Sequence, residues 1–103
     1  MIKKAVRMKL YPGVKEEYAR RHNEIWPEMR KMLKEHGAIS YSIFLDNETN
    51  YLFGYLEIED EGIWARVPDT QINREWWTFM KDMMETNDDE SPVTIELEQV
   101  FEL

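Results

Sequence analysis

The 103-residue sequence contains no cysteine, which excludes disulfide bonds and catalysis by a thiol group. It also has no long hydrophobic run, and lysines and an arginine interrupt its first eleven residues, so we expect neither a secretory signal peptide nor a membrane-spanning helix. Basic residues are fewer than acidic ones: the sequence has 13 Lys and Arg but 21 Asp and Glu, giving a formal net charge of −8. That charge argues against nucleic acids and anionic membranes as partners, and we expect a cytoplasmic protein.

Only two histidines are present, and their spacing argues against a metal site. His22 and His36 fall in one expected helix, which separates them by roughly 21 Å, so one chain cannot place both on the same ion. The sequence also lacks a glycine-rich phosphate loop and a serine nucleophile motif. We therefore expect no metal site. What remains is acid–base chemistry on a small neutral molecule.

Apolar side chains, by contrast, are abundant for so short a chain: 13% of the residues are aromatic and 7 are methionine. A chain of this length forms one domain, expected to span residues 1–103, and buries roughly two-thirds of its unfolded surface. So much apolar material suggests more than one buried surface. The chain is therefore expected to have a pocket, a partner subunit or both.

Hydrophobic spacing predicts the order strand, helix, strand, strand, helix, strand. Alternating side chains predict strands over 2–10, 38–46, 51–59 and 93–101. Helical spacing predicts helices over 14–36 and 71–84, with a shorter helix over 60–67, and the acidic segment 87–92 is expected to be a solvated connector. Pro27 should kink or restart the first helix, and Gly37 should end it in a left-handed conformation. This order is typical of a ferredoxin-like α+β sandwich, in which helices cover one face of an antiparallel sheet.

The hairpin formed by the second and third strands is apolar on both of its faces. Leu52, Leu56 and Ile58 share one face of the third strand, and Tyr51, Phe53 and Tyr55 share the other. A two-layer domain covers only one face of its sheet. We therefore expect a homodimer in which two sheets pack face to face as a dimeric α+β barrel. That interface would bury the Phe53 face together with Tyr41 or Phe44, depending on the strand register.

Tyr18 and His22 lie one turn apart on the apolar face of the first helix, with Cβ atoms roughly 5–6 Å apart. A histidine on such a face is more often a packed core residue than a catalyst. Two features favour chemistry here. Only the N-terminal half of this face carries hydrogen-bonding side chains, and a break at Pro27 would let that half separate from the sheet. Histidine suits proton transfer because its ordinary pKa lies near neutrality.

Trp76 and Trp77 point in directions roughly 100° apart around the second helix, so they cannot both enter the same core layer. At least one is expected to face a pocket or an interface, where a flat apolar ring suits the C–H face of a sugar. Tyr41, on the second strand, can donate a hydrogen bond. For Tyr41 and Trp76, packing in the core is an equally good interpretation.

Three segments together resemble the L-rhamnose mutarotase family. They are Tyr18-x-x-x-His22 followed by Ile25-Trp26-Pro27-Glu28, then Trp76-Trp77-x-x-Met80, and finally Asn87-x-Asp89-x-Ser91-Pro92-Val93. Each motif alone is weak, but the combination is specific, and the resemblance runs from the first strand to Val100-Phe101. The sequence departs from the pattern at Glu24, where a proline is common, and at Glu75, where a basic residue is common. Both positions adjoin the expected site.

The resemblance implies a dimeric α+β barrel isomerase that interconverts the α and β anomers of L-rhamnose without a metal or cofactor. By position, His22 corresponds to the family's proton donor, while Tyr18, Tyr41, Trp76 and Trp77 correspond to its sugar-binding residues. An acid would protonate the ring oxygen while a base removes the proton of the anomeric hydroxyl, and the opened ring would reclose on its other face. The second proton carrier stays open between Tyr18, a carboxylate and a bound water.

Two other functions also stay open. One is a cofactor-free monooxygenase on the same barrel, which would consume oxygen and bind an apolar aromatic substrate. The other is a dimer that binds sugar without catalysing a reaction.

Overall fold

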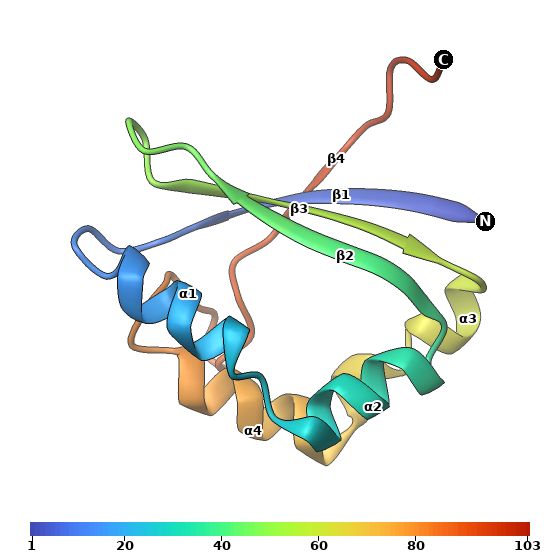
Figure 1. The fold of residues 1–103 in the computed structure, drawn as a ribbon, viewed down its shortest axis with the longest axis horizontal. Helices are drawn as coiled ribbons and strands as arrows, with labels where there is room; N and C mark the ends of the chain where they lie inside the picture. Colours follow the sequence, from blue (N-terminus) through green and yellow to red (C-terminus); the bar gives the residue numbers. More distant parts are fainter.

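The computed structural model describes the whole chain, Met1–Leu103, as a sheet and a layer of helices (Figure 1). The strands are β1 (Ile2–Lys9), β2 (Ala38–Leu45), β3 (Tyr51–Ile58) and β4 (Ile95–Leu97). The helices are α1 (Lys15–Asn23), α2 (Pro27–Glu35), α3 (Glu61–Trp64) and α4 (Gln71–Met80), and the 3-10 turn η1 (Val67–Asp69) lies between α3 and α4. The strands pair antiparallel in the order β2-β3-β1-β4. This confirms the predicted ferredoxin-like α+β fold.

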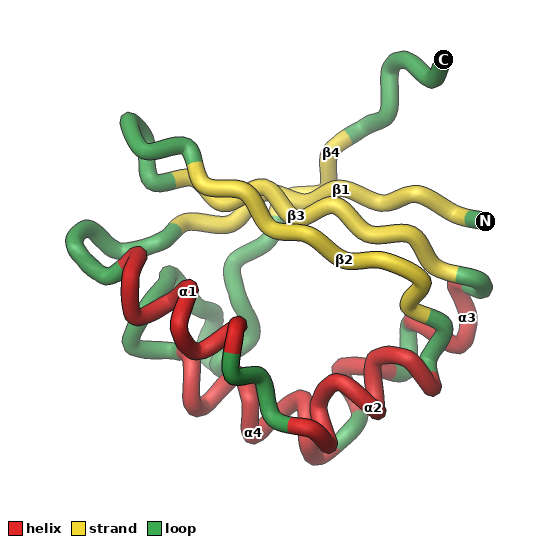
Figure 2. The backbone as a smooth tube through the Cα atoms, viewed as in Figure 1, coloured by secondary structure: helices red, strands yellow, loops and turns green.

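Helices α1, α2 and α4 cover one face of the sheet and leave the other face without a second layer (Figure 2). The alternation along the strands explains this arrangement, because inward-facing residues are buried against the helices. Met8, Leu52, Leu56 and Ile58 are between 0% and 7% exposed. Along β3 buried residues alternate strictly with half-buried ones, so the residues of the Phe53 face point away from the helices, as predicted.

The register between β2 and β3 decides which aromatic side chains of β2 face the helices. Tyr41 lies opposite Leu56, on the helix side of the sheet, whereas Phe44 lies opposite Phe53, on the uncovered side. A shift in register between Ala38 and Ser40 precedes this segment. The sequence left open whether Tyr41 or Phe44 lies on the same face as Phe53, and in the structure it is Phe44.

The first predicted helix is two helices rather than one. α1 ends at Asn23 and α2 begins at Pro27, whose missing N–H is no loss at a first helical position. Trp26 before it has φ −57° and ψ 135°, the extended conformation expected of a residue that precedes proline. The predicted restart at Pro27 is confirmed, and α1 and α2 meet at an angle below the sheet (Figure 1). Gly37, with φ 92°, follows α2 in the predicted left-handed conformation.

Two predicted boundaries were wrong. α4 stops at Met80 rather than at residue 84, because the chain turns there and then pairs Met84 with Leu10. The last strand covers only Ile95–Leu97 rather than 93–101, since it pairs with β1 at three positions and, as an edge strand, has no second neighbour. The helix predicted over 60–67 is the short α3 followed by η1.

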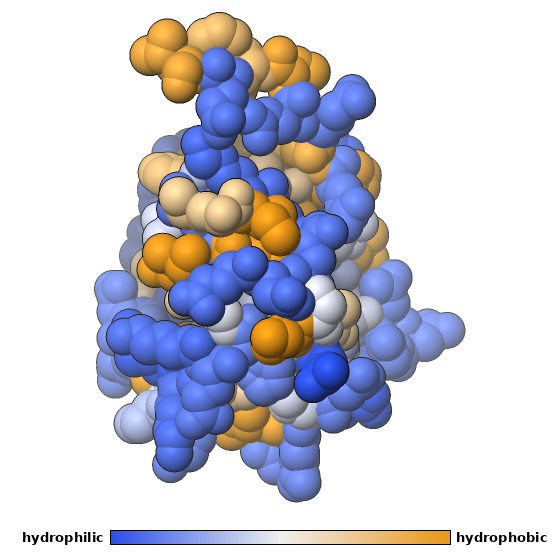
Figure 3. Space-filling view, turned by 90° about the vertical axis from the view of Figure 1, so that its right-hand side faces the viewer, coloured by the Kyte–Doolittle hydropathy of each residue, from blue (hydrophilic) through white to orange (hydrophobic).

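The residues after β4 extend away from the sheet on the side opposite the helices (Figure 1). The apolar side chains of this tail are exposed: Val100 is 88% exposed and Phe101 75%. In the space-filling view apolar surface gathers at the protruding end, above a largely polar body (Figure 3). No helix in the structure has both the length and the apolar character needed to cross a membrane.

Candidate active site

A cavity of about 930 Å³ lies between the helix-facing side of the sheet and the helices. This volume is typical of a small-molecule site. The cavity lining includes every residue that the sequence analysis placed at a site: Tyr18 and His22 from α1, Tyr41 from β2, and Trp76 and Trp77 from α4. Folding thus brings these five side chains to one space from three separate elements.

Arg21 holds α1 against the end of α4. Its guanidinium donates hydrogen bonds to the carbonyl of Phe79 at 2.7 Å and to Asp82 at 2.9 Å, and its Nε donates to Glu17 at 2.8 Å. The guanidinium carbon also lies 4.5 Å from the centre of the Phe79 ring. The hydrogen bond from Arg21 lowers the pKa of Asp82, which stays ionised. Since His22 follows Arg21 directly, the same contacts keep His22 close to α4.

The imidazole of His22 packs between Tyr18 and Trp76. Its ring centre lies 4.3 Å from that of Tyr18 and 5.4 Å from that of Trp76, which it meets edge to face. Its Nδ1 lies 3.0 Å from the carbonyl oxygen of Tyr18 and must carry the proton, because a carbonyl only accepts. Burial lowers the pKa of His22 below its usual 6.5, opposed by the hydrogen bond to Tyr18. At neutral pH the ring is therefore uncharged, and its Nε2 is an unprotonated base.

Tyr18 and Tyr41 bring two phenol groups to the cavity. Burial raises the pKa of Tyr18, and the neighbouring Tyr41 raises it further. Burial also raises the pKa of Tyr41, although 42% of this residue is exposed because it lines a cavity open to solvent. Both hydroxyl groups therefore stay protonated at neutral pH. They can donate hydrogen bonds to a bound oxygen atom, but they are not bases.

Gly54 in β3 lies under the ring of Tyr41 and close to Val6. A Cβ atom at Gly54 would lie 3.2 Å from Cγ2 of Val6 and 3.6 Å from Cε1 of Tyr41. The first distance is tighter than an ordinary contact, so a side chain here would crowd Val6, whereas the second is an ordinary van der Waals contact with Tyr41. The sequence analysis missed this residue; the available signal was a glycine in the middle of a strand, which often marks a close approach of another group.

The two tryptophans of α4 occupy different environments, as their spacing predicted. Trp76 is 7% exposed and meets Trp26 edge to face at 5.1 Å, so it belongs to the core as well as to the cavity wall. Trp77 is half-buried and lies against the edge of that core. Trp76 is therefore both a packed core residue and part of the cavity wall.

Two polar residues of the lining were not singled out from the sequence. Asn73 of α4 is 4% exposed, and a lone amide on an apolar helix face was the signal that could have found it. Glu90 belongs to the segment expected to be a solvated connector, and within that segment it is half-buried. Its carboxylate accepts a hydrogen bond from Thr78 at 2.6 Å and pairs with Lys81 at 2.7 Å, which ties the segment to α4 and its C-terminal end. These contacts, Lys81 foremost, lower the pKa of Glu90 and keep it ionised.

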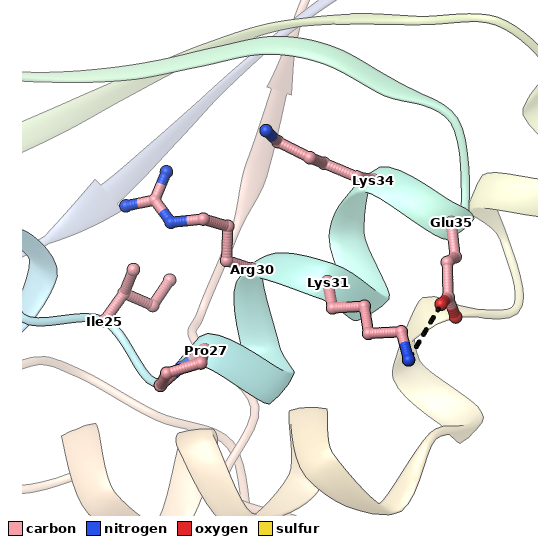
Figure 4. A pocket seen from close by; sticks show the side chains of 6 residues that line it. All are labelled: Ile25, Pro27, Arg30, Lys31, Lys34 and Glu35. Atoms are coloured by element: carbon pink, nitrogen blue, oxygen red, sulfur yellow. Dashed lines mark ion pairs between the residues drawn. The ribbon is translucent and has the colours of Figure 1, made fainter.

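Two cations of α2 lie at the edge of the cavity. Arg30 and Lys34 extend toward the sheet from successive turns, while Lys31 and Glu35 form an ion pair of 3.7 Å on another side of the helix (Figure 4). Arg30 and Lys34 line the cavity and also a shallower depression of about 550 Å³ beside it. The rim near α2 is therefore positive although the chain as a whole is strongly acidic.

Comparison with known proteins confirms the resemblance noted in the sequence. The family model described as L-rhamnose mutarotase matches residues 3–103. A protein of Enterococcus faecalis named L-rhamnose mutarotase is 62% identical over 103 residues, covering 100% of both chains. One of Lachnoclostridium phytofermentans with the same name is 52% identical over 103 residues, covering 100% of this chain and 99% of its own.

Solved structures agree with this result. The crystal structure of an L-rhamnose mutarotase from Formosa agariphila has a TM-score of 0.92 and 41% identity, covering 100% of this chain and 99% of that one. An antibiotic biosynthesis monooxygenase has a TM-score of 0.63 at 12% identity, covering 97% of this chain and 99% of its own, which indicates a shared fold alone. The chain belongs to the L-rhamnose mutarotase family.

Proposed function

We propose that the protein is an isomerase that interconverts the α and β anomers of L-rhamnose in this cavity. In this proposal His22 transfers the proton, and Tyr18, Tyr41, Trp76 and Trp77 bind the sugar. Family membership supports the choice of substrate. The observation that carries the mechanism is a neutral imidazole with a free Nε2, held beside a phenol in a cavity with aromatic walls.

The cavity suits a neutral deoxy sugar. L-rhamnose carries a methyl group at C5 where most hexoses carry a hydroxymethyl group, and the mainly apolar lining favours such a group. The half-buried ring of Trp77 offers a flat surface for the C–H bonds of the sugar. The hydroxyls of Tyr18 and Tyr41 remain protonated and are free to donate hydrogen bonds to sugar oxygens.

The chemistry requires one proton to leave the sugar and one to arrive. Nε2 of His22 takes the proton of the anomeric hydroxyl while a donor protonates the ring oxygen; the bond between C1 and the ring oxygen breaks and the aldehyde forms. After rotation about the C1–C2 bond, the C5 hydroxyl formed from the ring oxygen attacks the other face of the aldehyde and returns its proton to the donor. The imidazolium then returns its proton to the former carbonyl oxygen. His22 is thus a base in ring opening and a proton donor in ring closure, and no electron is gained or lost.

Tyr18 is the best candidate for the donor to the ring oxygen. Its ring lies 4.3 Å from that of His22, so the two groups can reach neighbouring oxygens of one sugar. Glu90 is a poor alternative, because Lys81 and Thr78 hold it in its anionic form. A water molecule between Tyr18 and the sugar would serve equally well as the immediate donor.

Magnetisation-exchange NMR on the two anomeric signals of L-rhamnose tests the proposed function directly. The protein should accelerate exchange above the rate in buffer. Binding of the sugar without acceleration would support a sensing or transport role instead. Consumption of oxygen with an aromatic substrate would support the monooxygenase alternative.

The pH dependence of catalysis should reflect the lowered pKa of His22. Since burial favours the neutral ring, Nε2 remains a base below pH 6.5 and becomes protonated only at the lower pKa of the folded protein. We therefore expect the acid limb of kcat/KM to be centred below pH 6.5. Exchange rates measured across this range, with the buffer rate subtracted at each pH, check the prediction. An acid limb centred above 6.5 would contradict it.

We also infer that the protein is a homodimer whose sheets pack through their outer faces. The support is an uncovered face that carries Phe44 at 64% exposure opposite Phe53, with Ile95 and Leu97 of β4 exposed on the same side. The tail, with its exposed Val100 and Phe101, leaves the body on this side as well, within reach of a second copy (Figure 1).

Light scattering should give twice the 12.5 kDa chain mass at micromolar concentration. Phe44→Glu should shift the protein toward the monomer, because it would bury an unpaired charge in the interface. Lys31→Glu on the exposed side of α2 is the matched control and should leave the dimer intact. A monodisperse monomer for the parent protein would refute the dimer.

A further inference from the structure

One buried polar side chain lacks a partner. Asn73 is 4% exposed, and its Nδ2 has no hydrogen-bond partner in the protein. Other buried residues of α4, Trp76 and Met80, are apolar. Buried amide groups without partners are rare because they lose hydrogen bonds to water and gain none in return. The presence of an asparagine in this helix therefore calls for a ligand that pairs with it.

Two backbone acceptors near Asn73 already have side-chain donors. The hydroxyl of Thr70 donates to the carbonyl of Val67 at 2.7 Å, and Nε of Arg74 donates to that of Pro68 at 3.0 Å. Thr70 and Arg74 thus donate hydrogen bonds to carbonyl groups of η1, whereas Asn73 makes no such bond. Asn73 instead lines the cavity that contains His22. It precedes Trp76 and Trp77 by three and four residues, the spacing that places side chains on one side of a helix.

We propose that Asn73 binds the substrate, with its amide hydrogen-bonded to a ring hydroxyl of the sugar. This inference rests on the proposed function. A sugar hydroxyl both donates and accepts, and an amide offers both partners, whereas most of the cavity wall offers neither. The bond would fix the rotation of the sugar ring over Trp77 and hence the distance of the anomeric carbon from His22. Asn73 is then a specificity residue and not a proton carrier.

Asn73→Leu removes the amide and keeps a similar volume. We expect KM for L-rhamnose to rise about threefold to tenfold, as for the loss of one neutral hydrogen bond, with a smaller change in kcat. The Tm without sugar should be unchanged or higher, because an apolar group replaces an unpaired polar one. Gln71→Leu, on the exposed side of the same helix, is the matched control and should change neither quantity. A lower Tm with an unchanged KM would make Asn73 a structural residue and overturn the proposal.

Monodeoxy analogues of L-rhamnose at C2, C3 and C4 identify the hydroxyl. With the parent protein, one analogue should show a raised KM; with Asn73→Leu, that analogue and the complete sugar should have equal KM values. Analogue preferences that are identical in parent and variant would overturn the proposal. If the leucine variant does not fold, Asn73→Ala is measured in its place, and failure of both to fold would assign Asn73 to the core and overturn the proposal.

The parent protein separates this inference from the proposed function. A parent that does not accelerate anomer exchange refutes the proposed function. If the parent protein accelerates exchange and the Asn73→Leu variant has the same KM as the parent, only the role of Asn73 is refuted.

Discussion

Replacement of His22 by asparagine should slow exchange between the α and β anomers of L-rhamnose by roughly two to four orders of magnitude. Asparagine keeps a hydrogen-bonding side chain of similar reach, but it cannot take up a proton near neutral pH. The fold and part of the sugar binding should remain, because the other residues that line the cavity are unchanged. NMR exchange measurements with the uncatalysed rate subtracted give the size of the loss.

His36 provides a closely matched control. Its Nδ1 lies 2.8 Å from the carbonyl of Met32, the same four-residue contact at the end of α2 that His22 makes in α1. His36 does not line the cavity, so His36→Asn should leave exchange nearly unchanged. Circular dichroism establishes that both variants are folded. A folded His22→Asn protein that exchanges at the parent rate would remove His22 from the mechanism.

Trp76→Ala should be the most destabilising of the substitutions considered, with a loss of about 3–5 kcal/mol in the free energy of unfolding. Trp76 is 7% exposed, and its ring contacts those of Trp26, His22 and Phe79 at centre distances of 5.1 to 5.6 Å. Its removal would leave a hole where α1, α4 and the segment before α2 meet. Such a loss is a large share of the stability of a domain of this size, and unfolding in urea measures it.

Trp77→Ala should separate sugar binding from folding. Trp77 is only half-buried, so its loss should cost less stability than that of Trp76, while the sugar loses a flat apolar surface. We expect a raised KM in a folded protein, with partial recovery in Trp77→Phe, which retains an aromatic ring. Melting curves would be recorded beside activity. If both alanine variants lose activity only in proportion to lost folded protein, the tryptophans are core residues alone.

The local pattern of the sequence was sufficient for the order of the elements and for the family. Alternation in β1 and β3 and helical spacing in α4 depend on near neighbours in the chain, and therefore they are visible without a structure. The same holds for Pro27 and Gly37, whose backbone preferences act within one or two residues. Tyr18 and His22 could be paired because a helix places residues four apart on one side.

Contacts between distant segments decided the rest. Whether Tyr41 or Phe44 faces the helices depends on the register of β2 against β3, and a shift of one residue exchanges the two faces. The short length of β4 depends on what β1 can pair with, which the alternation over 93–101 does not reveal. The lowered pKa of His22 and the unpaired amide of Asn73 are consequences of burial. Burial is a property of the packed layers: spacing can place Asn73 and His22 on apolar helix faces, but it gives neither the missing partner of the amide nor the pKa of the imidazole.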